Sequence, residues 1–184
     1  MARPKKIDRD QLLDAAEAIV RDRGAAALTI DALAKACGIT KGGVQYTFAS
    51  KDEIIDAMFE RWNAGYDLRF AELAGSSDDP QRRIRAHITA TREGDEASYA
   101  KAASLMAALL QTPEHLQSTR DWYQDKLRGL DAETAEGRRL RLGFLASEGA
   151  FLLHYLRFLP PMDQQEWDDI YDDIERLLDG DATL

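Results

Sequence analysis

Two adjacent glycines, Gly42 and Gly43, follow a lysine in a short segment that is otherwise suited to binding an anion. Each glycine costs about 1 kcal/mol relative to alanine in a helix interior, so the pair does not serve helix stability. The first turn of a helix carries unpaired backbone N–H groups and the positive end of the helix dipole, and both attract phosphate oxygens. Glycine there removes side chains that would hold the backbone away from such a partner. The pair therefore indicates either a helix start that lies against a large anion, or only a weak helix or loop.

The rest of the sequence lacks the residue groupings that enzymes use. It contains no G-x-S-x-G elbow, P-loop or dinucleotide fingerprint. The three histidines have no paired-ligand spacing, and the single cysteine cannot make a zinc site. The acidic pairs 168–169 and 172–173 are better explained as a solvated helix face than as a divalent-ion site. We therefore expect no catalytic residues, no bound metal and no cofactor.

The net charge of −9 is unevenly distributed along the chain. Through Lys51 there are nine Lys and Arg against six Asp and Glu, a balance of +3, while the remainder holds 15 basic and 27 acidic residues. Such asymmetry indicates an anionic partner for the N-terminal segment. Arg3, Lys5 and Lys6 either track phosphates or form a solvated arm.

The composition favours a cytoplasmic protein without a membrane partner. One cysteine fits a reducing compartment. The opening "MARPKKIDRD" has no apolar run behind its basic residues, so we do not expect a signal peptide. No apolar stretch approaches the roughly 18–20 residues that span a bilayer.

Glycine, proline and capping residues divide the chain into about nine helices, and no segment has the pattern of a strand. Asp8, Thr29, Thr40 and Ser50 are predicted to cap the first four helices. The first three helices are short, with a tight turn at Gly38. The sequence therefore predicts an all-α fold, with a helix-turn-helix domain over residues 1–52 and a helical bundle over residues 53–184.

The stretch "RDQLLDAAEAIVRDRGAAALTIDALAKACGITKGGVQYTFASKDEII" resembles the DNA-binding domain of the tetracycline-repressor (TetR/AcrR) family. The resemblance covers about the first 55 residues, and the remainder matches the family only in helical layout. It implies a homodimeric transcriptional regulator, usually a repressor, which leaves a palindromic operator when a small molecule binds the C-terminal ligand-binding and dimerisation domain. The commonest target in the family is a drug-efflux transporter.

The resemblance also implies which residues contact double-stranded DNA. The predicted DNA-binding residues are Thr29, Thr40, Lys41, Gly42, Gly43, Gln45, Tyr46, Thr47 and Lys51. Family members commonly have tyrosine at the position of Gln45 and histidine at that of Thr47. Gln45 can bond adenine through two hydrogen bonds, and Thr47 can contact a thymine methyl group. The operator therefore cannot be taken from better-known relatives.

The segment "LGFLASEGAFLLHYLRFL" is apolar all round, so both of its faces should be covered. We predict that it forms a four-helix dimer interface with the last helix and their mates, whereas the alternative is a buried helix in a monomer. The predicted interface residues are Gly143, Ala146, Gly149, Ala150, Leu153, Trp167, Ile170, Tyr171 and Ile174.

A ligand pocket is harder to locate from sequence. Candidate residues that are either pocket lining or ordinary core are Phe70, His87, Tyr99, Met106, Leu109, His115 and Trp122. They favour an aromatic, apolar or cationic inducer. An activator with the same architecture stays possible. So does a helical ligand-binding or scaffolding protein whose helix-turn-helix no longer reads DNA.

Overall fold

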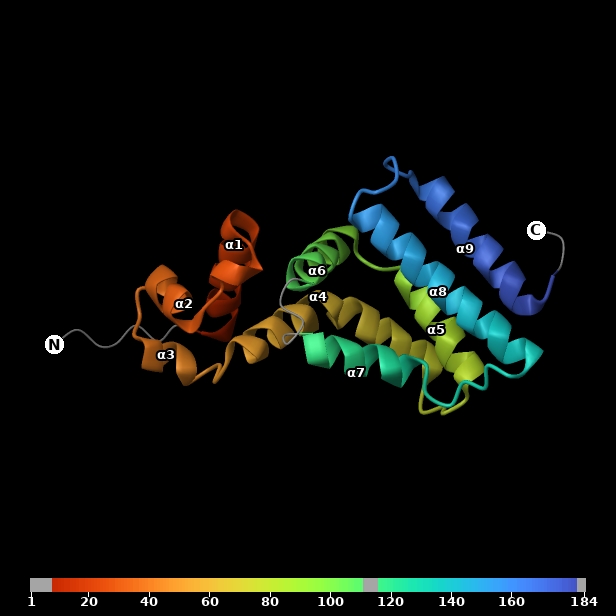
Figure 1. Cartoon of the computed structure of the whole chain (residues 1–184), viewed down its shortest axis with the longest axis horizontal. Helices are drawn as coiled ribbons and strands as arrows, with labels where there is room; N and C mark the ends of the chain where they lie inside the picture. The colour runs from red at the N-terminus through yellow and green to blue at the C-terminus, as the bar shows by residue number, and fades with distance from the viewer. Residues whose placement is uncertain (1–7, 111–115, 182–184) are drawn as a thin grey trace. The chain divides into compact units, whose positions relative to one another are not determined.

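The structure of the chain is a computed structural model, which describes residues 8–110 and 116–181 (Figure 1). The described residues contain nine α-helices, one short 3₁₀ helix and no strand, which confirms the predicted all-α class. The elements are α1 (Arg9–Arg23), η1 (Ala25–Ala27), α2 (Ile30–Cys37), α3 (Lys41–Gln45), α4 (Lys51–Ala74), α5 (Pro80–Arg92), α6 (Glu96–Leu109), α7 (Gln117–Lys126), α8 (Ala135–Tyr155) and α9 (Gln164–Asp179).

The described residues form two compact units. The first is built from the described residues up to Trp62 and from Leu105 to Ser118, and the second from the other described residues, so α4, α6 and α7 contribute to both. The start of α4 belongs to the first unit because its side chains bond back to α1. Trp62 Nε1 donates to Glu17 Oε1 at 2.9 Å, and Arg61 pairs with Asp14 at 2.7 Å.

The core of the first unit is mainly aliphatic, with Phe48 and Trp62 as buried aromatic residues. Each of its members is less than 10% exposed, and they include Leu12, Leu13, Leu28, Leu33, Val44, Phe48, Ile54, Ile55 and Met58. The periodic apolar positions of α1 and α2 therefore face inward, as amphipathic helices require. Ile30 and Ile39, which the sequence also places in this core, are only partly buried.

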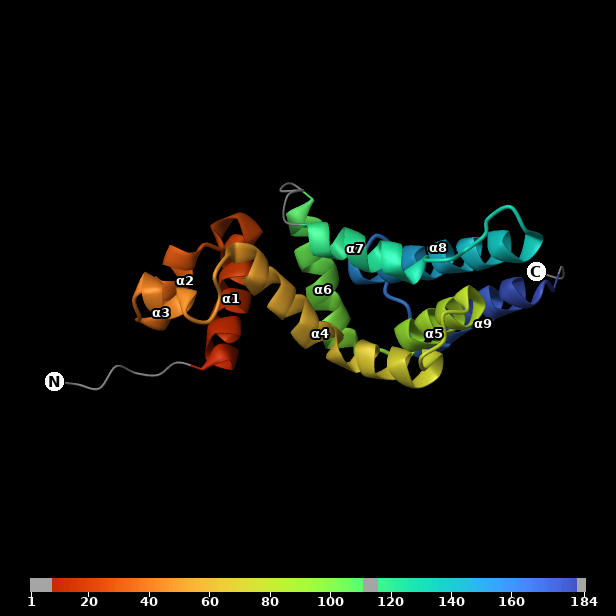
Figure 2. The same cartoon turned by 90° about the horizontal axis from the view of Figure 1, so that it is seen from below.

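In the second unit α5, α8 and α9 pack together, and Figures 1 and 2 show these helices from two directions. Ile84 and Ile88 of α5 and Phe144 of α8 meet the apolar face of α9. Gly143 lets α9 approach α8 closely, because a Cβ atom there would lie 2.6 Å from Leu178 Cδ2.

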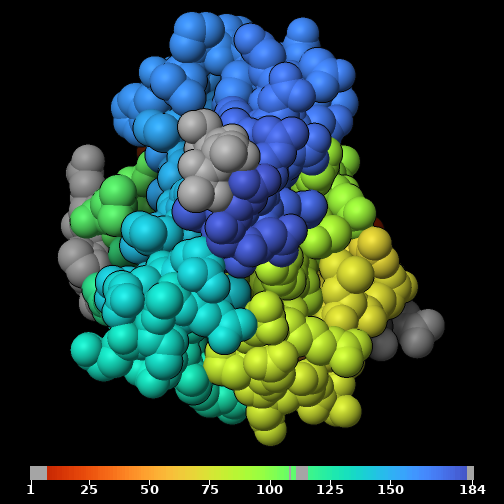
Figure 3. Space-filling view, turned by 90° about the vertical axis from the view of Figure 1, so that its right-hand side faces the viewer, coloured from red at the N-terminus to blue at the C-terminus, as the bar shows by residue number. Residues whose placement is uncertain are grey.

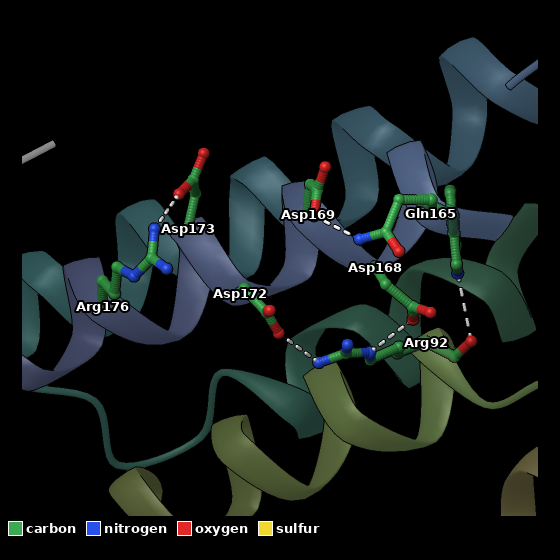
Figure 4. A network of polar contacts seen from close by, with 8 residues as sticks. Arg92, Gln165, Asp168, Asp169, Asp172, Asp173 and Arg176 are labelled. Carbon is green, nitrogen blue, oxygen red and sulfur yellow. Dashed lines mark hydrogen bonds and ion pairs between the residues drawn. The ribbon is translucent and has the colours of Figure 1, made fainter. Parts of the chain in front are cut away.

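Arg92 of α5 holds α9 through two carboxylates one turn apart (Figure 4). Its Nε lies 2.9 Å from Asp168 Oδ1, and its Nη1 lies 2.8 Å from Asp172 Oδ1. The backbone carbonyl of Arg92 also accepts a hydrogen bond from Trp167 Nε1 at 3.0 Å. Asp168 and Asp172 are therefore ion-pair partners within the fold rather than members of a solvated face. In the described part of the chain, no group of acidic, histidine or cysteine side chains could hold a metal ion.

The outer face of α9 is charged. In the space-filling view of Figure 3, α9 (deep blue) lies at the surface of the second unit. Its exposed residues include Glu166, Asp169, Asp173 and Arg176. No helix within residues 8–110 and 116–181 combines the length and the apolar character that crossing a bilayer requires.

Candidate functional site

Two threonines that the sequence predicts as DNA contacts are helix caps. Thr29 Oγ1 accepts a hydrogen bond from Ala32 N at 3.0 Å at the start of α2. Thr40 Oγ1 accepts one from Gly43 N at 3.1 Å at the start of α3. A hydroxyl that accepts a hydrogen bond still has its own proton to donate. Both threonines are exposed, so capping leaves each O–H able to donate to a phosphate oxygen.

The turn between α2 and α3 depends on Gly38. Its φ of 66° is in the left-handed region, which glycine adopts without steric cost. Its N–H bonds to the end of α2, and Ile39 N donates to Ala34 O at 3.0 Å. These bonds cap α2 and fix where α3 begins.

Burial of one side of α3 determines which residues face outward. Val44 and Phe48 are 0% and 2% exposed, so this side of the segment is fixed in the core. Tyr46, in contrast, is 92% exposed, which is unusual for a large aromatic side chain. Thr47 is half-buried, and the remaining predicted contacts on this segment are exposed, namely Lys41, Gly42, Gly43 and Gln45. The structure thus leaves the predicted DNA-contacting residues of the α3 segment accessible to a partner, with Thr47 partly covered.

The fold itself does not require glycine at position 42. A Cβ atom there would have Thr40 Oγ1 at 3.9 Å as its nearest neighbour, which is ordinary van der Waals contact. At Gly43 the nearest atom would be Ile39 Cδ1 at 3.3 Å, the end of a flexible side chain. Packing within the described residues therefore does not explain the glycine at position 42.

Both lysines predicted to contact DNA have partners within the chain. Lys41 Nζ lies 3.1 Å from Asp31 Oδ2 in an exposed ion pair. Lys51 Nζ donates to the carbonyl of Ala25 at 3.0 Å and is half-buried. Lys51 therefore stabilises the fold as well as carrying charge. The sequence did not reveal either partner, because both are brought in by the turns between helices.

The predicted ligand residues are divided between the two compact units. Phe70, His87, Tyr99 and Trp122 lie in the second unit, whereas Met106 and Leu109 belong to the first. His115 lies outside the described residues. In the second unit the ring of Tyr66 lies 5.9 Å from Phe70, 5.8 Å from His87 and 5.7 Å from Trp122, between centroids. Tyr99 packs instead on Phe151, with ring centroids 5.2 Å apart.

A chain of polar groups crosses the interior of the second unit. Tyr66 Oη lies 2.9 Å from His87 Nδ1. His87 Nε2 lies 2.9 Å from Glu148 Oε1, outside hydrogen-bonding geometry, and Tyr123 Oη donates to Glu148 Oε2 at 2.6 Å. Burial, with the nearby charge of Glu148, raises the pKa of Tyr66 and of Tyr123, so both phenols keep their protons. Sequence reasoning found only His87, because these residues come from four different helices.

The predicted dimer residues fall into two groups. Gly143, Ala150, Trp167, Tyr171 and Ile174 are buried by their own chain, and Ile170 packs against the same core. These six residues therefore take part in the packing between α8 and α9 within the chain. Ala146 and Leu153 are exposed, and a Cβ atom on Gly149 would meet nothing within 4 Å.

Two further leucines share the outward face of α8. Leu142 is 51% exposed and Leu145 is 56% exposed. With Ala146, Gly149 and Leu153 they recur every three or four residues, so they form one stripe, which we call the α8 stripe.

Comparison with known proteins supports the same organisation. The family model for bacterial regulatory proteins of the tetR family matches residues 12–58, and that for the tetracyclin repressor-like C-terminal domain matches residues 81–179. The HTH-type transcriptional repressor KstR2 of Mycobacterium tuberculosis (strain H37Rv) is 29% identical over 93 residues. KstR2 of Rhodococcus jostii (strain RHA1) is 28% identical over 95 residues. These matches cover 50% and 52% of this chain and 46% and 47% of the relatives, so they span about half the length of each.

Solved structures share the fold over nearly the whole chain. A transcriptional regulator from Rhodococcus sp. Rha1 has a TM-score of 0.59 at 23% identity, covering 95% of this chain and 97% of that one. The TetR family regulator PfmR from Thermus thermophilus has a TM-score of 0.58 at 20% identity, covering 94% and 96%. The multidrug binding protein EbrR, complexed with imidazole, has a TM-score of 0.55 at 21% identity, covering 95% and 96%. With family models matching both parts of the sequence, this chain belongs to the TetR family of bacterial regulatory proteins.

Proposed function

We propose that the chain is a cytoplasmic, homodimeric transcriptional repressor that binds a palindromic operator and leaves it when a small molecule binds. One observation carries the DNA-binding part: the α3 segment exposes polar side chains around Gly42, a glycine that its own fold does not need. A helix presented in this way can enter the major groove with its first residues against base edges and phosphates. Residues 1–52 are then the DNA-binding domain, and residues 53–184 bind the ligand and the second copy.

The exposed side chains divide into two kinds of contact. Thr29, Thr40 and Lys41 donate to phosphate oxygens, which positions the helix without reading sequence. Gln45 and Thr47 read base edges, and Tyr46 packs along the groove or donates its hydroxyl proton. Lys41 must exchange Asp31 for phosphate, and this exchange is favourable because both side chains are exposed and weakly held.

The α8 stripe supports the homodimer. A row of leucines at about half exposure is unusual for a monomer surface, whereas it suits close packing against a second helix around Gly149. A twofold dimer presents two α3 segments, which is the arrangement that a palindromic operator requires.

Two features support a ligand response. The second unit buries charged and polar side chains in its aromatic interior, which is typical of a site that orients a ligand. Tyr66 and Phe70 of that interior lie on α4, the same continuous helix that begins at Lys51. A ligand that shifts these rings therefore acts on the helix that anchors the DNA-binding domain. The target gene favoured by the family resemblance is an efflux transporter.

Fluorescence anisotropy tests the proposal directly. Purified protein is titrated onto DNA flanking its own gene and onto scrambled DNA of equal length, at two salt concentrations. We expect tight binding to the flanking DNA alone, weakening as salt rises because phosphate contacts release counterions. Equal weak binding to both DNAs, followed by failure to select any site from random DNA, would contradict the proposal and favour a ligand-binding or scaffolding protein.

A further inference from the structure

Lys126, the last residue of α7, carries a buried ammonium group within an aromatic cage. The residue is 7% exposed. Its Nζ lies 3.6 Å from the centroid of the Phe70 ring, 4.9 Å from that of Trp122 and 5.4 Å from that of Tyr66. Aromatic faces attract a cation, but they do not replace the hydrogen bonds that an ammonium makes in water.

This ammonium has no anionic partner at short range. Within residues 8–110 and 116–181, no carboxylate makes an ion pair with Lys126, whereas the neighbouring Arg83 has such a pair with Asp125. Asp67 and Asp125 act on Lys126 only at longer range, and burial outweighs them, so the pKa of Lys126 is lowered. A buried charge without a bonded counter-ion is costly, and folded proteins generally pair it.

The surroundings of the cage disfavour a second cation. Arg83 is 8% exposed, and its guanidinium lies 5.9 Å from the same Phe70 ring. Asp125 neutralises Arg83 at 2.8 Å, and Glu148 is already held by Tyr123 and lies against His87. Among the described residues, Arg83 therefore has a carboxylate partner and the Lys126 ammonium beside it has none within ion-pair distance. An incoming amine would meet that charge, whereas an incoming acid would neutralise it.

We infer that the small-molecule effector is an organic monocarboxylate with an apolar ring or chain, and that its carboxylate pairs with Lys126. Its body would lie along Phe70 and Trp122, which are both only partly buried and so border the surface. This inference rests on the proposed ligand response, and it names the chemical class that the second unit accepts. It also gives the response a route, because the ring closest to the ammonium belongs to α4.

The test compares matched ligands that differ only in charge. Benzoate, cyclohexanecarboxylate and naphthalene-2-carboxylate are each measured beside the corresponding primary amide and primary amine. Isothermal titration and thermal shift are performed on the full chain without DNA. We expect one or more carboxylates to bind and to raise the melting temperature, with the matched amide and amine at least about tenfold weaker, as for a charge-assisted hydrogen bond.

Three variants locate the binding. Lys126→Met keeps the length of the side chain and should abolish the preference for carboxylates, whereas Lys126→Arg should retain it. Lys35→Met, at an exposed lysine of α2, should leave it unchanged. Any of three results would overturn the inference. The wild type could bind acids and amides equally, the Lys126→Met variant could bind acids as well as the wild type does, or no carboxylate could bind at millimolar concentration.

A second readout separates this inference from the proposed function. The same ligands are added to the protein–DNA complex, and release is followed by anisotropy. If carboxylates bind at Lys126 but do not release the protein from DNA, the proposed ligand response is wrong and the carboxylate site is still supported. If only neutral or cationic ligands release the protein from DNA, the inferred ligand class is wrong and the proposal of a ligand-responsive repressor is still supported.

Discussion

A Cβ atom at Gly42 would make only one ordinary contact within its own chain, with Thr40 Oγ1 at 3.9 Å. A methyl group there should therefore affect DNA binding and not folding. We expect Gly42→Ala to leave the melting temperature unchanged or higher, because alanine stabilises a helix by up to about 1 kcal/mol relative to glycine. Affinity for the operator should fall about tenfold or more, since the methyl group holds α3 away from the DNA. Thermal unfolding and anisotropy on the same preparation measure both effects.

Gly65 provides the matched control. It lies on α4, is exposed, and a Cβ atom there would meet nothing within 4 Å. Gly65→Ala should stabilise the protein without weakening DNA binding. If the Gly42→Ala variant binds the operator as tightly as the Gly65→Ala variant does, the proposal that DNA approaches the backbone at position 42 is wrong.

Cys37, at the end of α2, should be a slow nucleophile at neutral pH. Partial burial raises the pKa of its thiol, so a smaller fraction is thiolate, the reactive form. We expect iodoacetamide to label the folded protein more slowly than glutathione at pH 7.5, and the rate to rise as the pH approaches the raised pKa. Intact-mass spectrometry follows the labelling. Labelling faster than glutathione would instead indicate an activated thiol that could serve a redox function.

At the scale of elements, Arg92 joins α5 to α9, and replacing it should lower the stability of the protein mainly above acidic pH. The Arg92 side chain holds the pKa of Asp168 below its ordinary value. The pair therefore contributes full stability above the ordinary carboxyl pKa of about 4, and that contribution is lost as the pH falls through the lowered value. We expect Arg92→Met to lower the melting temperature at pH 7 by roughly 2–6 °C, and by less near pH 3.

Arg176→Met serves as the control for that substitution. Its ion pair with Asp173, 2.8 Å long, also lies on α9, but both side chains are 58% exposed. Exposed pairs three residues apart contribute little, so the melting temperature should barely change at either pH. Equal effects of the two substitutions would mean that Arg92 does not hold α5 to α9 in solution.

The helices and their caps could be predicted from sequence because the signals are local. Asp8, Thr29, Thr40 and Ser50 each accept a hydrogen bond from the first turn that they precede, as predicted. The partners of Lys41 and Lys51 could not be predicted from sequence, because turns separate Asp31 from Lys41 and Ala25 from Lys51. Nor could periodicity decide which apolar face of α8 packs on α9. Small residues lie on both faces, and the three-dimensional packing assigns Gly143 and Ala150 to the inside.

At the scale of the whole molecule, the α8 stripe predicts the oligomeric state. We expect Leu145→Asp to place a carboxylate in the centre of the proposed interface and to convert the dimer to a monomer. Light scattering coupled to size exclusion measures the mass. The affinity for the operator should fall about a hundredfold or more, because each DNA-binding domain then binds its half of the operator alone.

Leu68 of α4 is the control, since it is an equally exposed leucine outside the stripe, 65% accessible. Leu68→Asp should remain dimeric and retain operator binding. A dimer that survives Leu145→Asp would show that the second copy docks elsewhere.

The α3 helix has five residues, two of them glycine, and so it cannot persist by itself. Isolated helices shorter than about 12–15 residues are marginal even in alanine-rich peptides. Its order is therefore supplied by the burial of Val44 and Phe48 and by the cap at Thr40. Amide hydrogen exchange should follow from this. The backbone of α3 should exchange faster than that of α1 in the free protein and slow markedly on operator DNA, so that part of the binding free energy is spent in ordering the reading helix.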